Sequence, residues 1–205
     1  MGRRGEHTKQ EYKSMALAAA EQIVSQSGLQ GLTARKVATA IGYTVGSLYL
    51  VFKNLDDLIM QVNARTLDEM YSYILNRIED KRDQHDALLA SAHAYVDYAS
   101  ENPHRWMMVF EHKPPEGEEF PDWYMTKVSE LFALVERVLN PSPLEDISRM
   151  SLMSQALWGG VHGVCVLALT RNYAVLGIAD IRPVVDSLVL NYLTGAEQRK
   201  EISAA

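Results

Sequence analysis

Apolar residues recur at spacings of three and four along most of the chain, which is the period of an amphipathic α-helix. The first helix is expected to begin after Thr8, because Thr8 and Glu11 have the spacing of a capping box. Gly28 is expected to end it, since glycine readily adopts the left-handed conformation that closes many helices. No segment alternates as a β-strand does, and the pattern predicts an all-α chain of about nine helices.

Two short helices joined by a tight turn are predicted next. Thr33 is placed to cap the first of them and Thr44 to cap the second, which is expected to reach about Phe52. Gly42 lies between them, and short helices joined by a glycine turn are typical of a helix-turn-helix. With the preceding helix they form a predicted three-helix head, residues 1–53.

The remainder, residues 54–205, is predicted to be a larger helical body. A long helix is expected to start after an Asn54 cap and to continue to about Ile78. Further helices are predicted over residues 87–100, 103–112, 122–139, 143–170 and 180–193, with a capping box at Ser142 and Glu145 and a stop at Gly195.

The single cysteine, Cys165, excludes an intrachain disulfide and a thiolate zinc cluster, and it suits a reducing compartment. The N-terminal residues contain no apolar stretch of signal-peptide length. The longest apolar run, residues 164–169, is far shorter than the roughly twenty residues of a membrane span. A cytoplasmic protein without a membrane segment is therefore expected.

The net charge of −6 is unevenly distributed along the chain. Residues 1–53 carry seven basic and three acidic side chains, a net charge of +4, whereas residues 54–205 carry a net charge of −10. A basic head on an acidic body favours a polyanionic partner at the head, although surface charge can also be uneven without functional meaning.

Residues 32–58, with the sequence LTARKVATAIGYTVGSLYLVFKNLDDL, resemble the DNA-binding head of the TetR family of transcriptional regulators. The resemblance extends from about Thr8 to Leu58 and combines the leading amphipathic helix, the glycine turn, the Leu-Tyr pair and the Phe-x-Asn-x-Asp-Asp-Leu exit. It implies a recognition helix that enters the major groove of double-stranded DNA. The family often has a lysine at the position of Leu55, so one phosphate contact is expected to be absent here, with Lys53 as a partial substitute.

Polar and small side chains around the predicted recognition helix are the candidates for DNA contacts. Hydroxyl and ammonium groups bond phosphate oxygens and fix the register, whereas an arginine can form a bidentate pair with guanine. By the resemblance, Arg35 is the candidate base-reading residue. The predicted DNA-binding residues are Thr33, Arg35, Thr44, Val45, Gly46, Ser47, Tyr49 and Lys53, and the predicted core residues of this segment are Val37, Ala38, Ile41, Tyr43 and Leu48.

The body carries a second, shorter resemblance, in which residues 158–163 (WGGVHG) are similar to the Trp-x-x-x-His-Gly signature of one TetR-type C-terminal domain. Trp158 and His162 are one helical turn apart and share a face. They either line an effector pocket, with His162 as its polar group, or belong to the core with a hydrogen-bonded histidine. Aromatic and methionine side chains elsewhere in the body present the same choice between pocket and core. The predicted effector-binding residues are Trp106, Phe110, Tyr124, Trp158 and His162.

Gly159 and Gly163 are spaced so that another group could approach the helix closely: a ligand, another helix of the body or a second subunit. The resemblance favours dimerisation through the last two long helices. A twofold dimer would match a pseudo-palindromic operator with half-sites about one DNA turn apart.

Catalysis is not expected, because the GxSxG, HExxH, GxxxxGK and Gly-rich dinucleotide motifs are absent from the sequence. No cofactor and no metal site are predicted. His104 and His112 could share one helix face, but the histidines otherwise lack the spacing of metal ligands.

The sequence therefore predicts a homodimeric DNA-binding transcriptional regulator, expected to be a repressor that a small apolar or amphipathic effector releases from its operator. The alternative is a DNA-binding module of the same fold whose body responds to a protein partner or to no small ligand.

Overall fold

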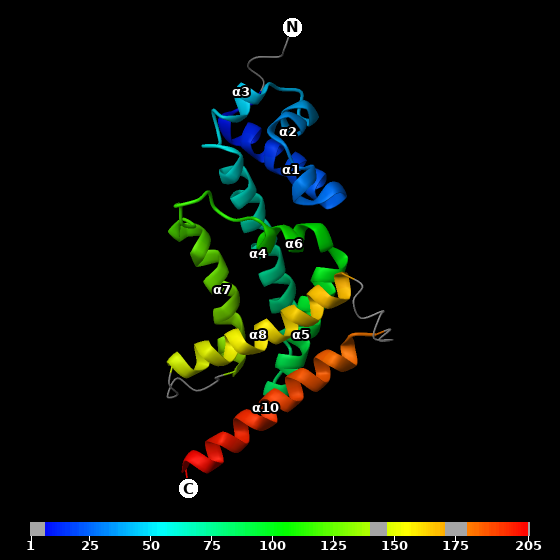
Figure 1. Ribbon diagram of the computed structural model, residues 1–205, viewed down its shortest axis with the longest axis vertical. Coiled ribbons are helices and arrows are strands. Elements are labelled where there is room, and N and C mark those ends of the chain that lie inside the picture. The colour runs from blue at the N-terminus through cyan, green and yellow to red at the C-terminus, as the bar shows by residue number, and fades with distance from the viewer. Residues whose placement is uncertain (1–6, 140–146, 171–179, 205) are drawn as a thin grey trace. The chain divides into compact units, whose positions relative to one another are not determined.

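The computed structural model describes residues 7–139, 147–170 and 180–204, and the secondary structure of these residues is entirely helical (Figure 1). The described residues form nine helices, so the all-α prediction is confirmed. The helices are α1 (Lys9–Gly31), α2 (Ala34–Ala40), α3 (Val45–Leu48), α4 (Leu55–Ile78), α5 (Gln84–Glu101), α6 (Pro103–Glu111), α7 (Asp122–Leu139), α8 (Ile147–Leu169) and α10 (Arg182–Ala204).

The chain is divided between two compact units, each built from segments that are distant in the sequence. Unit 1 comprises Met1–Asp68 and Asn102–Lys127, so it joins the predicted head to α6 and to the first turns of α4 and α7. Unit 2 comprises Glu69–Glu101 and Val128–Ala205. The boundary predicted after residue 53 is based on where the DNA-binding motif ends, whereas the two units are defined by which residues pack together. The predicted boundary therefore stays a prediction.

The N-terminal end of α1 forms as the sequence predicts. Thr8 Oγ1 accepts the Glu11 main-chain N–H at 3.2 Å, and Glu11 Oε2 accepts the Thr8 main-chain N–H at 2.7 Å. The hydrogen bond from the Thr8 main chain is the main reason why the pKa of Glu11 lies below its usual value. Gly28 has the predicted positive φ of 64°, but the helix resumes beyond it and ends at Gly31. The glycine therefore kinks α1 and does not end it.

The predicted third helix is shorter than expected, because α3 ends at Leu48 and not at about Phe52. The chain beyond it continues in tighter turns, in which the Val51 N–H bonds to the Leu48 carbonyl at 3.1 Å. Leu48 and Phe52 are nevertheless both buried. Their spacing of four indicated a helix, yet a tight turn also brings both side chains to the core.

The C-terminal end of the last helix was also predicted wrongly. Gly195 was expected to end it, but α10 continues to Ala204. A glycine inside a helix costs about 1 kcal/mol relative to alanine, which is too little to stop a helix whose neighbouring turns form. α5 begins at Gln84, earlier than the predicted residue 87, because Asp83 caps it through the main-chain N–H groups of His85 and Asp86. The capping box predicted at residues 142–145 lies outside the described residues.

Unit 1 encloses an apolar core to which α1, α2, α3, α4 and α6 all contribute. Its members include Ala16 and Val24 of α1, Val37 of α2, Leu48 of α3 and Met108 of α6. Of the predicted core residues in the head, Val37, Ala38 and Leu48 are buried, whereas Ile41 and Tyr43 are half-buried. Packing of this core fixes the orientation of α2 and α3.

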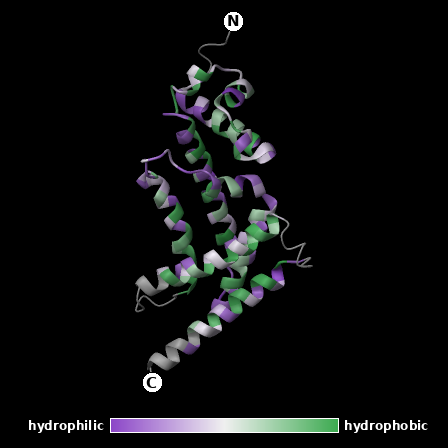
Figure 2. Cartoon of the chain, in the orientation of Figure 1, coloured by the Kyte–Doolittle hydropathy of each residue, from purple (hydrophilic) through white to green (hydrophobic). Residues whose placement is uncertain are grey.

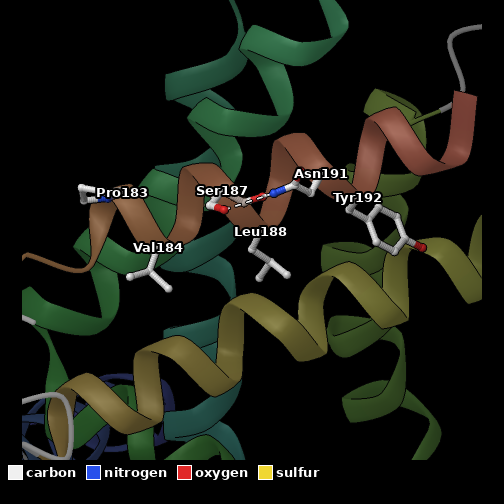
Figure 3. A pocket seen from close by; sticks show the side chains of 6 residues that line it. All are labelled: Pro183, Val184, Ser187, Leu188, Asn191 and Tyr192. Atoms are coloured by element: carbon white, nitrogen blue, oxygen red, sulfur yellow. Dashed lines mark hydrogen bonds between the residues drawn. The ribbon is translucent and has the colours of Figure 1, made fainter. Parts of the chain in front are cut away.

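Unit 2 is built around α5, α8 and α10, each of which packs against the other two. Val184, Leu188 and Tyr192 of α10 point toward α8 (Figure 3). Gly160 of α8 leaves room for Leu188, since a Cβ at Gly160 would lie 2.8 Å from Leu188 Cδ2. The neighbour at Gly160 is therefore another helix of the same chain, whereas the close neighbour predicted at Gly159 and Gly163 stays a prediction.

The residues Ser151–Leu169 of α8 are long and apolar enough, by length and composition, to cross a membrane, with a mean hydropathy of 1.5. Figure 2 shows hydrophobic residues along this helix. Only 28% of the stretch is buried within the chain. A helix that packs between subunits has the same composition, so this property alone does not indicate a membrane protein. Within residues 151–169 of α8, the exposed residues are Leu152, Gln155, Ala156, Gly159 and Leu167. Together with half-buried Gly163 they share one side, which is apolar or small except for Gln155.

Candidate nucleic-acid interface

The turn between α2 and α3 is closed by main-chain hydrogen bonds. The Tyr43 N–H bonds to the Ala38 carbonyl at 2.9 Å and the Gly42 N–H bonds to the Thr39 carbonyl at 3.1 Å, which is the pattern of a Schellman motif. Gly42 has a φ of 75°, and this left-handed conformation suits glycine at the position after a helix. The turn therefore sets the direction in which α3 leaves α2.

Two threonines cap the helices of this motif, as the sequence predicts. Thr33 Oγ1 accepts the Lys36 N–H at 3.2 Å, and Thr44 Oγ1 accepts the Ser47 N–H at 3.2 Å. The hydroxyls of Thr44 and Ser47 also lie 2.9 Å apart. These contacts fix the first turn of α3 and orient both hydroxyls on its solvent side, where they could bond phosphate oxygens.

The cationic side chains of the head differ in what they already bind. Lys36 Nζ donates to the Gly31 carbonyl at 2.8 Å and so helps to close α1. Arg35 and Lys53 are exposed, and within the described part of the chain neither side chain forms a hydrogen bond or an ion pair. The two cations that the sequence assigned to DNA are thus available to a partner.

The remaining predicted DNA-binding residues lie on or next to α3. Gly46 and Tyr49 are exposed, and Val45 is half-buried. Sequence reasoning did not single out Leu50, which is 74% exposed in the turn after α3. Residues 48–52 are all apolar or aromatic, so no signal in the sequence distinguished Leu50 from the core.

The exit from the helix-turn-helix is fixed by a second cap. Asn54 Oδ1 accepts the Asp57 N–H at 2.8 Å, and Asp57 Oδ2 accepts the Lys53 N–H at 2.8 Å. These two bonds hold the main chain of Lys53 against the first turn of α4. Leu55, where the family often has a lysine, packs against the apolar core of unit 1.

Three of the predicted effector-binding residues lie in unit 1. The rings of Trp106 and Phe110 meet at 5.1 Å between centroids, and Trp106 is fully buried. Tyr124 is buried and stacks on Phe120 at 4.8 Å. Burial raises the pKa of Tyr124 above its usual value, which keeps the phenol neutral.

The other two predicted effector-binding residues lie in unit 2. His162 stacks on Trp158 with ring centroids 4.9 Å apart, and the ring centroid of Phe132 lies 5.4 Å from that of Trp158. Tyr95 Oη lies 3.0 Å from His162 Nδ1, and burial lowers the pKa of His162. A neutral imidazole whose Nδ1 accepts the Tyr95 hydroxyl fits both observations. His162 thus has the hydrogen-bonded environment of the core alternative, and its role toward an effector stays a prediction.

No metal site is found in the residues that the structure describes, where no group of three His, Cys, Asp or Glu side chains could hold an ion. His104 and His112 have separate partners: His104 Nδ1 lies 2.9 Å from the Ser25 carbonyl, and His112 Nε2 lies 3.1 Å from Asp56 Oδ1.

Comparisons with known proteins cover both parts of the chain. Residues 16–62 match the family described as bacterial regulatory proteins, tetR family. Residues 88–192, slightly more than half of the chain, match the family described as tetracyclin repressor-like, C-terminal domain. The HTH-type transcriptional regulator Rv0681 of Mycobacterium tuberculosis is 30% identical over 176 residues, which cover 86% of this chain and 77% of that protein.

Solved structures share the fold over nearly the whole chain. A protein from Rhodococcus sp. RHA1 has a TM-score of 0.75 at 17% identity, with 94% of this chain and 98% of that chain covered. The transcriptional regulator FadR of Bacillus subtilis, solved in complex with stearoyl-CoA, has a TM-score of 0.64 at 14% identity, with 89% and 98% covered. The helix-turn-helix geometry, the two family matches and the regulator from Mycobacterium tuberculosis together show that this chain belongs to the TetR family of DNA-binding transcriptional regulators.

Proposed function

We propose that the protein is a homodimeric repressor that works in the cytoplasm, binds a pseudo-palindromic operator and is released from it by a small apolar or amphipathic effector. The observation that carries the DNA-binding part is the pair of exposed cations, Arg35 and Lys53, on either side of a capped α3 in a head of net charge +4. Lys53 binds phosphate and Arg35 reads a base edge.

The DNA contact is tested by titrating the protein against the DNA upstream of its own gene at several salt concentrations. Counterion release requires log K to fall with log salt, so a slope near zero would contradict phosphate binding. Lys53→Ala weakens binding to all sequences alike, whereas Arg35→Ala relaxes the preference at one base pair of each half-site. Arg82→Ala, which removes the same charge from the loop after α4, is the matched control and leaves the affinity within about twofold.

Dimerisation is supported by a stripe on one side of α8, formed by the exposed residues Leu152, Ala156, Gly159 and Leu167 and by half-buried Gly163, with exposed Gln155 as a polar neighbour. A Cβ at Gly159 or Gly163 would meet no atom within 4 Å in the chain, so a second copy could approach this side closely. Beside it, Pro183, Ser187 and Asn191 of α10 are also exposed and border an open hollow of about 710 Å³. We infer that α8 and α10 pack on the same helices of a partner.

Light scattering tests the dimer. Gly159→Arg places a large charged side chain on the stripe and is expected to halve the mass in solution while the helical circular dichroism is retained. Glu79→Arg, at an exposed position just after α4, is the control and leaves the mass unchanged. A dimer that persists in Gly159→Arg would contradict an interface on this side of α8.

Effector release requires that the ligand bind the DNA-incompetent arrangement more tightly than the competent one. α4 is suited to link the two events, because it begins next to Lys53 and contributes residues to both units. FadR of Bacillus subtilis, which shares the fold, was solved with stearoyl-CoA, and this supports an apolar effector for a body of this kind. Operator release that depends on a small molecule supports the proposal, whereas release only by a protein partner supports the alternative of a ligand-independent body.

A further inference from the structure

Unit 1 contains a buried polar cluster formed by Asn63 of α4, His112 at the end of α6 and Tyr124 of α7. Asn63 is 0% exposed and His112 is 6% exposed. The carbonyl of Met108 joins two of them, because it accepts the Asn63 amide N–H at 3.4 Å and the His112 main-chain N–H at 3.1 Å. The Asn63 side chain also lies close enough to Tyr124 to oppose the rise in the Tyr124 pKa that burial causes. The three side chains are thus neighbours, although they come from three helical segments.

Aromatic rings border this cluster. Phe120, in the segment before α7, lies 6.2 Å from the ring of His112 and 4.8 Å from the ring of Tyr124, with the last two planes inclined by only 23°. Phe120 is half-buried, whereas the polar side chains beneath it are buried. An apolar molecule that entered beside Phe120 would therefore meet aromatic faces first and polar atoms at the end.

Two polar atoms of the cluster have no hydrogen-bond partner in the described part of the chain: Asn63 Oδ1 and His112 Nδ1. Buried polar atoms are satisfied in the great majority of cases, so two on adjacent side chains require an explanation. Asn63 uses its amide hydrogens toward the Met108 carbonyl, which leaves Oδ1 as an acceptor. His112 Nε2 faces the Asp56 carboxylate and must carry the hydrogen, so in the neutral ring Nδ1 is an acceptor as well.

We propose that Asn63 Oδ1 and His112 Nδ1 are the polar recognition atoms of the effector site, and that they bind a neutral aromatic molecule whose polar group donates two hydrogens, as an aromatic amine does. Both atoms accept, so a ligand that only accepts hydrogen bonds leaves them unsatisfied. The inference rests on the effector-responsive function proposed above and specifies the chemistry of its ligand.

The same cluster reaches the start of α4. His112 Nε2 is bound to Asp56, the second residue of α4, and the next residue, Asp57, holds the main chain of Lys53. A donor that binds Nδ1 fixes the orientation of the imidazole and therefore acts on the first turn of α4. Occupation of the site is expected to change operator affinity through this connection.

Three small molecules of nearly the same shape test the donor requirement: 4-ethylaniline, 4-ethylphenol and 4-ethyltoluene, which offer two, one and no polar hydrogens. Binding to the full-length protein is measured by calorimetry and by the shift in melting temperature. The affinity is expected to fall about five- to tenfold with each donor lost, because each unmade hydrogen bond leaves a buried acceptor unsatisfied. Equal affinities for the three compounds, or no binding of any of them at millimolar concentration, would overturn the proposal; in the second case an ordered water is the natural occupant.

Variants assign the effect to the cluster. Asn63→Leu and His112→Phe are each expected to reduce the preference for 4-ethylaniline over 4-ethyltoluene to below about twofold. His93→Phe removes a half-buried histidine of unit 2 that also faces a carboxylate, that of Asp186, and is the matched control that keeps the preference. If either cluster variant fails to fold, the change in the imidazole nitrogen resonances of wild-type His112 on addition of 4-ethylaniline gives the same answer. An unchanged preference in both variants, or unchanged resonances, rejects the site.

The outcome is separable from that of the proposed function. Salt-dependent operator binding tests the regulator without reference to any ligand. Release of the operator by a compound whose effect is unchanged in Asn63→Leu and His112→Phe would leave the effector-responsive repressor standing and reject this site.

Discussion

The contact between Gly160 of α8 and Leu188 of α10 offers a sharp test of how these helices pack. A Cβ added at Gly160 would lie 2.8, 3.3 and 3.5 Å from three carbon atoms of the Leu188 side chain. Carbon atoms at optimal separation are about 3.5–4.0 Å apart, so the leucine must move or the helices must separate. At Gly163, one turn further along α8, and at Gly195 of α10, an added Cβ meets no atom within 4 Å.

The magnitude follows from two opposing terms. Alanine in place of a helical glycine stabilises the helix by about 1 kcal/mol at any of these positions. Overpacking costs about 1–3 kcal/mol in a filled interior, and the lower end applies here because the clash is with the terminal carbons of the half-buried Leu188 side chain. The helix term cancels between variants, so Gly160→Ala is expected to be less stable than Gly195→Ala by about 1 kcal/mol.

Urea unfolding followed by circular dichroism at one fixed protein concentration measures this difference, since the stability of a dimer depends on concentration. Leu188→Ala in the background of Gly160→Ala should recover the overpacking cost, which a double-mutant cycle isolates. Equal stabilities of Gly160→Ala and Gly195→Ala would refute the packing described here. A Gly163→Ala variant whose loss of stability grows on dilution would indicate that a partner covers this position.

Three further predictions concern local features. Thr33→Ala and Thr44→Ala each remove a helix cap and are expected to lower the free energy of unfolding by about 1 kcal/mol. Urea titration measures this loss against Thr39→Ala, which changes an exposed threonine of α2. Burial lowers the pKa of His162, so the unfolded chain takes up its proton first as the pH falls. The stability that neutral His162 contributes is therefore present above the ordinary histidine pKa of about 6.5 and is lost below it. Wild type should lose more stability than His162→Gln between pH 7.5 and 5.5, and parallel losses would contradict this. Burial raises the pKa of Cys165 to about 12, so its thiol should resist a thiol reagent at pH 8 in the folded protein and react in urea, whereas rapid labelling of the folded protein would contradict its burial.

The features that sequence reasoning predicted correctly are local ones. The capping box at Thr8, the caps at Thr33 and Thr44 and the glycine turn at Gly42 each depend on residues within five positions of one another. The hydrogen bonds that satisfy a helix end are made by these neighbours, so residue type and spacing are sufficient to identify them. The exposed cation at Lys53 follows from the same local motif.

The features that were missed depend on which segments meet. Nothing in the spacing of Asn63, His112 and Tyr124 indicates that they share one buried cluster, since α6 and α7 reach Asn63 only through tertiary packing. Likewise the five predicted effector-binding residues lie in two different units. Their residue types alone do not indicate which side chains pack against one another. α3 ends earlier than predicted and α10 ends later. Helix propensities of ordinary residues differ by less than about 1 kcal/mol, so they do not determine whether a helix continues for another turn.

The proposed dimer also gives the charge distribution a measurable meaning. Each phosphate that a protein cation neutralises contributes about −0.9 to the slope of log K against log salt. Lys53 is the cation of each head that is predicted to bind phosphate, so its removal should reduce the slope by about 1 if one head binds and by about 2 if two heads bind. The acidic remainder of the chain, with a net charge of −10, does not alter this comparison, because it is present in both proteins. The salt dependence of a Lys53→Ala variant thus counts the heads on the operator without any assumption about how the two copies are joined.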